Sequence, residues 1–299
     1  MTERWLAPLR GVTIRAFREA FAVPLREAGF SGAFAPFIPA NPGLRVNARM
    51  LSDLADGTDD AFPVVPQVIT KHPDAMRTLL TAFREAGFVR ADLNAGCPFP
   101  MIVRRGRGSG LLAAPETLAR LLDVGCEMMG PGRFSLKVRL GRTTPDELLA
   151  LMPRINQYPL ACLTIHARTA RQMYAGTPDL DAFAAAAAAS VHPVLYNGDI
   201  GLADFAACPR EEEAVLRRPH VTGVMIGRGF VRMLGARPDA AACLRDYLER
   251  SCAELSGDRP VLGRLKELLD YWRAHAHWAR LWPVAKLCRT VDEFRSLLT

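Results

Sequence analysis

The chain has 299 residues, and 49% of them are hydrophobic, which is enough apolar material for a large buried core. Its formal net charge of +7 at pH 7 permits a polyanionic partner but does not identify one. No run of about 18 apolar residues is present, and the stretch Met1–Trp5 lacks the basic-then-apolar pattern of a signal peptide, so neither a membrane span nor export is expected.

Cysteine usage limits the compartment and the metal chemistry. The seven cysteines are odd in number, scattered along the chain, and include no Cys-x-x-Cys pair. Such a pattern is typical of proteins from a reducing compartment, and it offers no zinc or iron–sulfur framework. We therefore expect a cytoplasmic protein without a metal site.

Short β-like apolar runs alternate with helical patterns over most of the chain. Apolar residues spaced three to four positions apart predict helices over residues 14–28, 73–86, 115–128 and 145–157. The alternation predicts an α/β fold, a (β/α)8 TIM barrel, whereas a doubly wound sheet is less suitable because no Gly-x-Gly-x-x-Gly follows the first run. The eight β-like runs are Trp5–Pro8, Gly32–Phe37, Val64–Val68, Val89–Asn94, Phe134–Arg139, Ala161–His166, Pro193–Asn197 and Gly223–Ile226.

The alternation stops after about residue 237. Helical patterns then follow at Asp239–Cys252, Val261–His275 and Ala276–Leu298. We therefore predict two domains: a barrel over residues 1–237 and a small all-helical C-terminal domain over residues 238–299.

The stretch from Asp92 to Pro98 holds the strongest chemical signal. An apolar run ends there in Asn94, Gly96 and Cys97, and the proline follows directly. Proline fixes its own φ and biases the residue before it towards an extended conformation. A buried cysteine usually acts as a small hydrophobe, but a thiol held at a strand tip beside an amide and a glycine favours a catalytic role for Cys97.

Polar residues also gather at the ends of other predicted strands. In a (β/α)8 barrel the carboxyl ends of the strands form one rim, where catalytic groups collect. Gly227 and Arg228 follow the last strand and should open a helix whose first N–H groups can bind a phosphate. Lys137 offers a positive charge for an electron-rich cofactor ring. The set at this rim comprises Gln67, Lys137, Arg139, His166, Arg168, Asn197, Gly198, Asp199, Gly227 and Arg228.

These motifs, in this order and spacing, resemble those of the tRNA-dihydrouridine synthases. The resemblance covers residues 6 to about 235. In the tail, the segments Gly263–Tyr271 and Val291–Leu298 resemble the bacterial C subfamily more than the other subfamilies. The matching barrel motifs are Ala7–Thr13, Leu93–Pro98, Lys137–Arg139, His166–Thr169, Asn197–Ile200 and Met225–Gly229.

The resemblance implies an FMN-containing barrel joined to a helical tRNA-recognition domain. NADPH would reduce the flavin, a hydride would pass to C6 of a D-loop uridine, and Cys97 would donate a proton to C5. The tail resemblance implies position 16 as the target. A thiol with a pKa of about 8.5 is largely protonated at neutral pH and can serve as that acid. The positions implied to contact FMN are Ala7, Pro8, Leu9, Gln67, Asn94, Lys137, His166, Asn197, Gly198, Asp199, Gly227 and Arg228.

Basic residues are the candidates for contact with the tRNA itself. Extruding the target base from a folded tRNA costs about a few kcal/mol, and contacts elsewhere on the tRNA would offset that cost. A monomer is expected for an enzyme that must engage so large a substrate. We assign to the substrate and tRNA Arg139 and Arg168 at the rim, Arg104, Arg105 and Arg107 after the Cys97 loop, and Arg264, Lys266 and Arg273 in the tail.

The chain departs from the family pattern near its first two strands. The family usually has Met and Glu where this chain has Leu9 and Arg10, and it usually has an acidic residue where this chain has Pro36. These losses keep two alternatives open. One is an FMN barrel oxidoreductase acting on a free pyrimidine or a small enone, and the other is a catalytically weak homologue that binds tRNA.

Overall fold

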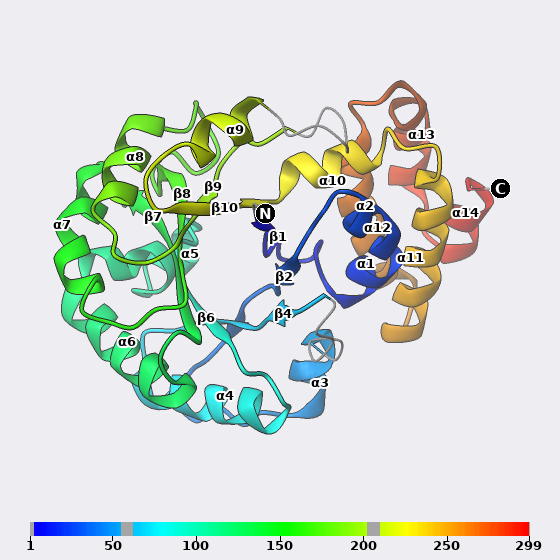
Figure 1. Ribbon diagram of the computed structural model, residues 1–299. Coiled ribbons are helices and arrows are strands. Elements are labelled where there is room, and N and C mark those ends of the chain that lie inside the picture. The colour runs from blue at the N-terminus through cyan, green and yellow to red at the C-terminus, as the bar shows by residue number, and fades with distance from the viewer. Residues whose placement is uncertain (1–2, 55–61, 202–209, 299) are drawn as a thin grey trace.

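The computed structural model describes residues 3–54, 62–201 and 210–298, and its strands form one parallel sheet curled into a barrel (Figure 1). The order of the ten described strands in the sheet is β3-β5-β6-β7-β8-β9-β10-β1-β2-β4. Their bounds are β1 (Glu3–Leu6), β2 (Gly32–Phe34), β3 (Ile38–Pro39), β4 (Val64–Val65), β5 (Gln67–Ile69), β6 (Ala91–Ala95), β7 (Phe134–Gly141), β8 (Leu163–Thr169), β9 (Val194–Asn197) and β10 (Val221–Ile226).

Prolines interrupt the second and third strands of the barrel, and the second continues past its predicted end at Phe37 into β3. Pro36 separates β2 from β3, and Pro66 separates β4 from β5. Proline has no N–H to donate to a ladder, so each strand is interrupted there. Pairing continues across the breaks, because β2 pairs with β4, β3 pairs with β5, and Ala35 N donates to Val65 O at 2.9 Å. The outermost strands of the order, β3 and β4, are thus parts of neighbouring barrel strands, which confirms the predicted TIM barrel.

Helices surround the barrel. Figure 1 shows α4, α6, α7 and α8 on one side, while α1, α2 and α10 lie towards the C-terminal helices. The predicted helix over residues 14–28 is two helices that meet at Phe21. The helices of the barrel region are α1 (Arg15–Ala20), α2 (Ala22–Glu27), α3 (Ala48–Leu51), α4 (Pro73–Glu85), α5 (Pro100–Val103), α6 (Pro115–Met129), α7 (Asp146–Ile155), α8 (Leu180–Ala188), α9 (Arg210–Leu216) and α10 (Arg228–Leu234), with short 3-10 helices at Ser52–Leu54 and Gly108–Ala113.

Four helices follow the barrel. They are α11 (Ala240–Glu254), α12 (Asp258–Trp272), α13 (Ala276–Leu287) and α14 (Val291–Ser296). The single helical pattern predicted over residues 276–298 is wrong, because Thr290 caps a new helix and forms a capping box with Glu293. Within the described part of the chain, no helix combines the length and the apolar composition that crossing a membrane requires.

Aromatic side chains join the C-terminal helices to the barrel helices. The Trp272 ring lies 6.1 Å from the ring of Phe21, and its Nε1 donates to Val231 O at 2.7 Å. Tyr247 packs edge-on against Phe17 at 6.2 Å. Because these rings are buried, they hold α11 and α12 against α1 and α10 at a fixed position.

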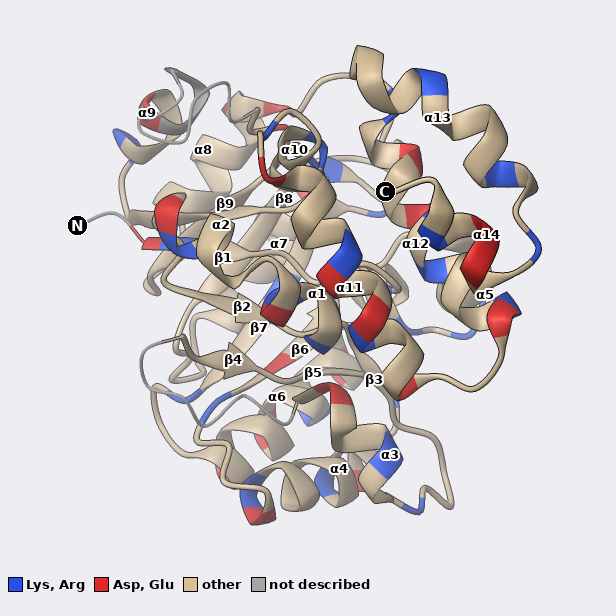
Figure 2. Ribbon diagram, turned by 90° about the vertical axis from the view of Figure 1, so that its right-hand side faces the viewer, with Lys and Arg blue, Asp and Glu red and all other residues tan. Residues whose placement is uncertain are grey.

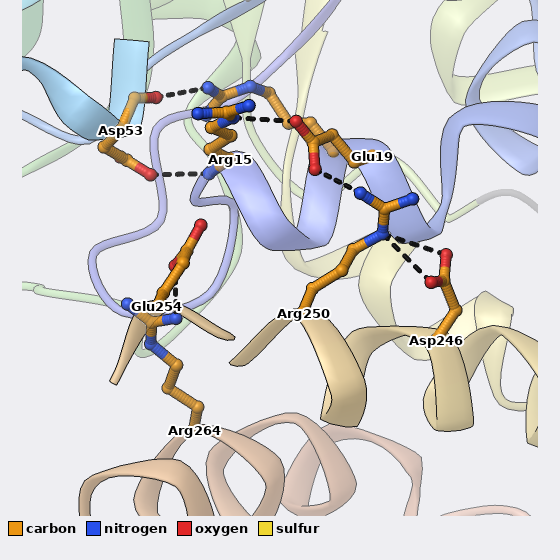
Figure 3. Close-up of polar contacts among 8 residues, drawn as sticks. Arg15, Glu19, Asp53, Asp246, Arg250, Glu254 and Arg264 are labelled. Atoms are coloured by element: carbon orange, nitrogen blue, oxygen red, sulfur yellow. Dashed lines mark hydrogen bonds and ion pairs between the residues drawn. The ribbon is translucent and has the colours of Figure 1, made fainter. Parts of the chain in front are cut away.

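Ion pairs also join the C-terminal helices to each other and to α1 (Figure 3). Glu19 on α1 accepts from Arg15 Nε at 2.7 Å and also pairs with Arg250 on α11. Arg264 on α12 donates to Glu254 at the end of α11, at 2.6 Å. These charges therefore connect α1, α11 and α12. The predicted boundary between the two domains, at residues 237/238, stays a prediction.

Candidate active site

A cavity of about 1040 Å³ opens at the carboxyl ends of the barrel strands. Loops after β1, β6, β9 and β10 contribute to its wall, together with residues of β7, β8 and α12. Gln67 and Asp199 do not line it, although each contacts a residue that does. The other ten predicted cofactor positions all line it: Ala7, Pro8, Leu9, Asn94, Lys137, His166, Asn197, Gly198, Gly227 and Arg228.

Cys97 lines the cavity on a loop that is held from two sides. Asn94 Oδ1 accepts from the N–H groups of Gly96, at 3.1 Å, and of Cys97, at 2.9 Å. On the other side Ser109 donates to Cys97 O from both its N–H and its Oγ, each at 3.0 Å. Gly108 has φ +55°, and a Cβ there would lie 2.8 Å from Cys97 Cβ, so glycine is required for this close approach.

The Cys97 thiol is protonated at neutral pH. Its residue is only 8% exposed, and burial raises the pKa of the thiol above its ordinary value. The Phe99 N–H and the charge of Arg139 oppose that rise without cancelling it. A protonated thiol at a cavity wall can donate a proton to a bound ligand.

Lys137 lies between the thiol loop and β9. Its Nζ donates to Asn197 Oδ1 at 2.7 Å, and Asn197 Nδ2 in turn donates to Met225 O at 2.7 Å. Burial, followed by the charge of Arg139, lowers the pKa of Lys137 to about 7. Its charge is therefore adjustable, and an anionic ligand in the cavity would favour the protonated form.

His166 is neutral at pH 7. Burial lowers the pKa of His166 well below its ordinary value, and the charges of Arg139, Lys137 and Arg168 lower it further. A neutral imidazole in this wall can offer a hydrogen bond without adding another positive charge.

Arg139 is buried and supports the thiol loop. Its Nε donates to Gly96 O at 2.9 Å, and its Nη1 donates to the main-chain oxygens of Thr169, at 2.9 Å, and Met173, at 2.7 Å. Burial lowers the pKa of Arg139 to about 10, so the guanidinium remains charged at pH 7. Arg139, predicted on the substrate side, does line the cavity.

Asp199 and Arg168 act as supports behind the wall. Arg168 has no exposed surface, and it donates to Gly176 O at 2.6 Å, to Ala175 O at 3.2 Å and to Asp199 Oδ1 at 3.1 Å. Asp199 also accepts from Arg228 Nη2 at 3.0 Å. The structure therefore places Arg168, which we assigned to the substrate side, beneath the surface.

Of the three arginines after the Cys97 loop that we predicted to contact RNA, two line the cavity and one does not. Arg104 and Arg105 line the cavity mouth, beside Phe99 and Met101, which are 49% and 68% exposed. Arg107 does not line the cavity. The mouth therefore combines positive charge with exposed apolar surface.

The three predicted basic residues of the tail lie outside the cavity wall. Arg264 pairs with Glu254, Lys266 Nζ donates to Cys288 O at 2.6 Å, and Arg273 is exposed near Asp270. Figure 2 shows both signs of charge on α11 and α12, whereas α13 carries basic residues and no acidic ones.

Sequence reasoning missed several residues of the wall. Tyr174 packs between two arginines, with its ring 4.4 Å from Arg228 Cζ and 5.4 Å from Arg139 Cζ. Glu267 and Tyr271, which lie on α12, also face the cavity. Their spacing of four residues places both on one helix face, but only the docking of α12 on the barrel turns that face inward.

Among the described residues, no three His, Cys, Asp or Glu side chains lie close enough together to hold a metal ion.

The chain is similar in sequence to known proteins. The family model described as dihydrouridine synthase (Dus) matches residues 5–256. The chain is 28% identical to tRNA-dihydrouridine(16) synthase of Ralstonia nicotianae, over 95% of this chain and 89% of that protein. It is 29% identical to tRNA-dihydrouridine synthase B of Vibrio cholerae, over 75% of this chain and 66% of that protein.

Solved structures share the fold at low sequence identity. The old yellow enzyme homologue from Zymomonas mobilis superposes with a TM-score of 0.56 at 14% identity, covering 83% of this chain and 88% of that one. Morphinone reductase in complex with tetrahydroNAD gives a TM-score of 0.55 at 10% identity, covering 77% of this chain and 84% of that one. The likeness shows the barrel fold, and the family match covers most of the chain, so this protein belongs to the dihydrouridine synthase (Dus) family.

Proposed function

We propose that this protein reduces a uridine of the tRNA D-loop, at position 16, to 5,6-dihydrouridine, with FMN as bound cofactor and NADPH as reductant. The observation that carries the proposal is the buried Cys97 thiol, whose pKa is raised by that burial, in the wall of a cavity that also holds Lys137 and His166. The Ralstonia relative, whose name specifies position 16, supports the choice of uridine.

The residues present fit a flavin mononucleotide. Gly227 caps α10, which begins at Arg228, so main-chain N–H groups and a guanidinium stand together where a phosphate would be held. A Cβ at Gly227 would lie 3.0 Å from Ala7 Cβ. Because glycine has no side chain, the main chain at this position packs closely on the loop after β1. Lys137, with a pKa of about 7, suits an electron-rich ring that gains negative charge on reduction. When bound, FMN supplies the hydride for C6 of the uracil ring.

The chain's own contribution is proton donation and positioning. Cys97 would give its proton to C5, the other carbon of the double bond being reduced, and the thiolate that forms would lie near the charges of Arg139 and Lys137. The supports of the thiol loop at Asn94 and Arg139 keep the sulfur in place during transfer.

The mouth of the cavity suits an extruded nucleotide of a larger RNA. Arg104 and Arg105 can bind phosphates on either side of the target, and Phe99 offers an exposed ring to an unstacked base. Glu267 and Tyr271 bring the C-terminal helices into the same wall. A small free pyrimidine or enone would need neither feature.

Reduction of unmodified tRNA tests the proposal. The purified protein is incubated with NADPH and an unmodified tRNA transcript, and dihydrouridine is mapped by position in parallel with Cys97→Ala. We expect dihydrouridine at position 16 with the wild type and a loss of about 100-fold or more in rate with the variant, the usual contribution of a general acid.

Other results would contradict the proposal. Bound flavin with no dihydrouridine in any tRNA would refute it, and turnover of a free pyrimidine or enone under the same conditions would favour the small-molecule alternative. Tight tRNA binding by both proteins without NADPH consumption would favour a binding homologue.

A further inference from the structure

Four buried polar side chains on three neighbouring strands form a continuous hydrogen-bonded chain that ends at the Cys97 loop. On β7, Ser135 Oγ donates to Asp92 Oδ1 at 2.7 Å, and on β5, Gln67 Nε2 donates to Asp92 Oδ2 at 2.7 Å. Asn94 Nδ2 then donates to Gln67 Oε1 at 2.7 Å. Asp92 and Gln67 have no exposed surface, so water does not compete for these bonds.

The N–H groups of the thiol loop need one particular direction of the hydrogen bonds in this chain. The N–H groups of Gly96 and Cys97 can only donate, so Asn94 must present Oδ1 to them and Nδ2 to Gln67. Gln67 must in turn present Oε1 to Asn94 and Nε2 to its other neighbour. That neighbour, Asp92, must therefore accept a hydrogen bond at Oδ2.

The pairing register of β5, β6 and β7 explains why these four side chains meet. Gln67 on β5 is level with Asp92 on β6, which is level with Ser135 on β7. Asn94 lies two residues further along β6, on the same face, and so stands one layer nearer the cavity. The series of hydrogen bonds thus runs from the barrel interior up to the thiol loop.

We propose that Asp92 is a positioning residue for Cys97, which sets the direction of the Gln67 and Asn94 amides and thereby holds the N–H groups of the thiol loop. The other supports of the loop, Arg139 and Ser109, bind its carbonyl oxygens and cannot replace this contact. The proposal rests on the proposed function only for the use of the thiol as a proton donor.

Exchanging donor and acceptor within the chain tests this role. Gln67→Glu replaces the donor facing Asp92 by a carboxyl group, so two acceptors meet and the hydrogen-bonded chain breaks once both carboxyls are ionised, whereas at lower pH a shared proton can bridge them. Asp92→Asn alone can turn its oxygen to Gln67 and its amide to Ser135 Oγ, whose hydroxyl lies 3.3 Å from Ala91 O and can donate there. In Gln67→Glu/Asp92→Asn the new amide donates to the new carboxylate, and every bond is restored with the same net charge.

Alkylation of Cys97 in the purified full-length protein is the readout. The rate with iodoacetamide is followed by peptide mass spectrometry from pH 6 to 10, and visible absorption gives the flavin content of each variant. We expect Gln67→Glu to react about tenfold faster where the carboxyl pair is ionised and the pH is still below the thiol pKa, because a loosened and wetter loop returns the pKa of the thiol towards its ordinary value. Asp92→Asn and the double variant should react within about twofold of the wild type.

A matched control separates this effect from general damage to the barrel. Thr70→Val removes a different buried bond, from Thr70 Oγ1 to Ala40 O at 2.7 Å, and should leave Cys97 alkylation unchanged. A wild-type profile in Gln67→Glu would overturn the proposal, as would a double variant no slower than Gln67→Glu. If Gln67→Glu does not fold, the double variant decides: a profile like that of Asp92→Asn supports the role, and a faster one overturns it.

Turnover on tRNA adds a second readout. Gln67→Glu should lower kcat more than it raises KM, and the double variant Gln67→Glu/Asp92→Asn should regain the lost kcat. Alkylation requires neither tRNA nor NADPH, so absence of turnover in the wild type would count against the proposed function alone.

Discussion

Glu267 on α12 and Arg10 in the loop after β1 share one end of the cavity wall. The carboxylate lies over Gly11, where a Cβ would come within 2.7 Å of Glu267 Oε2. Burial raises the pKa of Glu267, and the charge of Arg10 opposes that rise. Arg10 stands where the family usually has a glutamate, and its positive charge is thus complemented by the carboxylate of Glu267 on α12.

Reversing the charge of Arg10 tests this complementarity. Arg10→Glu places a second carboxylate near Glu267 and should lower the free energy of unfolding at pH 7 by about 1 kcal/mol, the upper range for a partly exposed pair. The loss should shrink as the pH falls to about 4, because the carboxylates become protonated and stop repelling each other.

Urea denaturation at both pH values measures the effect, and Arg10→Glu/Glu267→Lys should recover at least half of it. Arg120→Glu, at an exposed arginine on α6, serves as the control. An equal loss in this control, or no recovery in the double variant, would count against the pairing.

Lys137 should make flavin binding depend on pH. Its pKa is lowered to about 7, so the ammonium is present below that pH and is lost as the pH rises through it. The affinity of the apoprotein for riboflavin, which has no titrating phosphate, should therefore fall between about pH 6 and pH 8 if the ring lies beside Lys137. Fluorescence titration should show this slope in the wild type and not in Lys137→Gln; identical slopes would refute the contact.

Arg168 should be a stability residue. It is fully buried and bridges Asp199 to the main chain at Ala175 and Gly176, so Arg168→Leu leaves several acceptors unpaired. We expect a loss of about 3 kcal/mol in the free energy of unfolding, measured in urea. Arg273→Leu, at an exposed arginine, should change it by no more than about 0.5 kcal/mol. A strong tRNA-affinity defect at unchanged stability would instead assign Arg168 to the RNA.

The arginines at the cavity mouth should determine the salt dependence of tRNA binding. Each of Arg104→Ala and Arg105→Ala should reduce the slope of log K against log salt by about 0.7 to 0.9, as expected for one lost phosphate contact. Lys266→Ala should leave the slope unchanged, since its Nζ is bound to Cys288 O. Fluorescence anisotropy of labelled tRNA over about 50–200 mM salt measures the slopes. Equal reductions in all three would show that the mouth has no special role.

Phe99 should contribute through its ring. Phe99→Ala should weaken tRNA binding by about 1 kcal/mol or more without changing the salt slope, because stacking releases no counterions. Phe99→Tyr should retain the affinity, and Val284→Ala, at an exposed residue of α13, serves as the matched apolar control. A changed slope in Phe99→Ala would mean that the ring acts by placing the arginines.

The barrel and most of its rim could be predicted from the amino-acid sequence. Strand positions follow from local apolar runs. Asn94, Cys97 and Asn197 lie at or just after the ends of β6 and β9, whereas Lys137 and His166 lie within β7 and β8, which continue past the predicted ends to Gly141 and Thr169. Parallel strands in a barrel present their carboxyl ends on one side, and ten of the cofactor positions that the family resemblance implied line the cavity there.

Which charged residues face that cavity depends on the packed fold. Arg264 and Lys266 look like RNA contacts in the sequence, yet they bind Glu254 and Cys288, whereas their neighbours Glu267 and Tyr271 reach the wall. The face that α12 turns inward is set by the packing of Trp272 on the barrel helices, a contact between segments about 250 residues apart. The spacing of apolar residues in the sequence predicts that a helix has distinct faces. Only the elements on which the helix packs determine which face lies against the site.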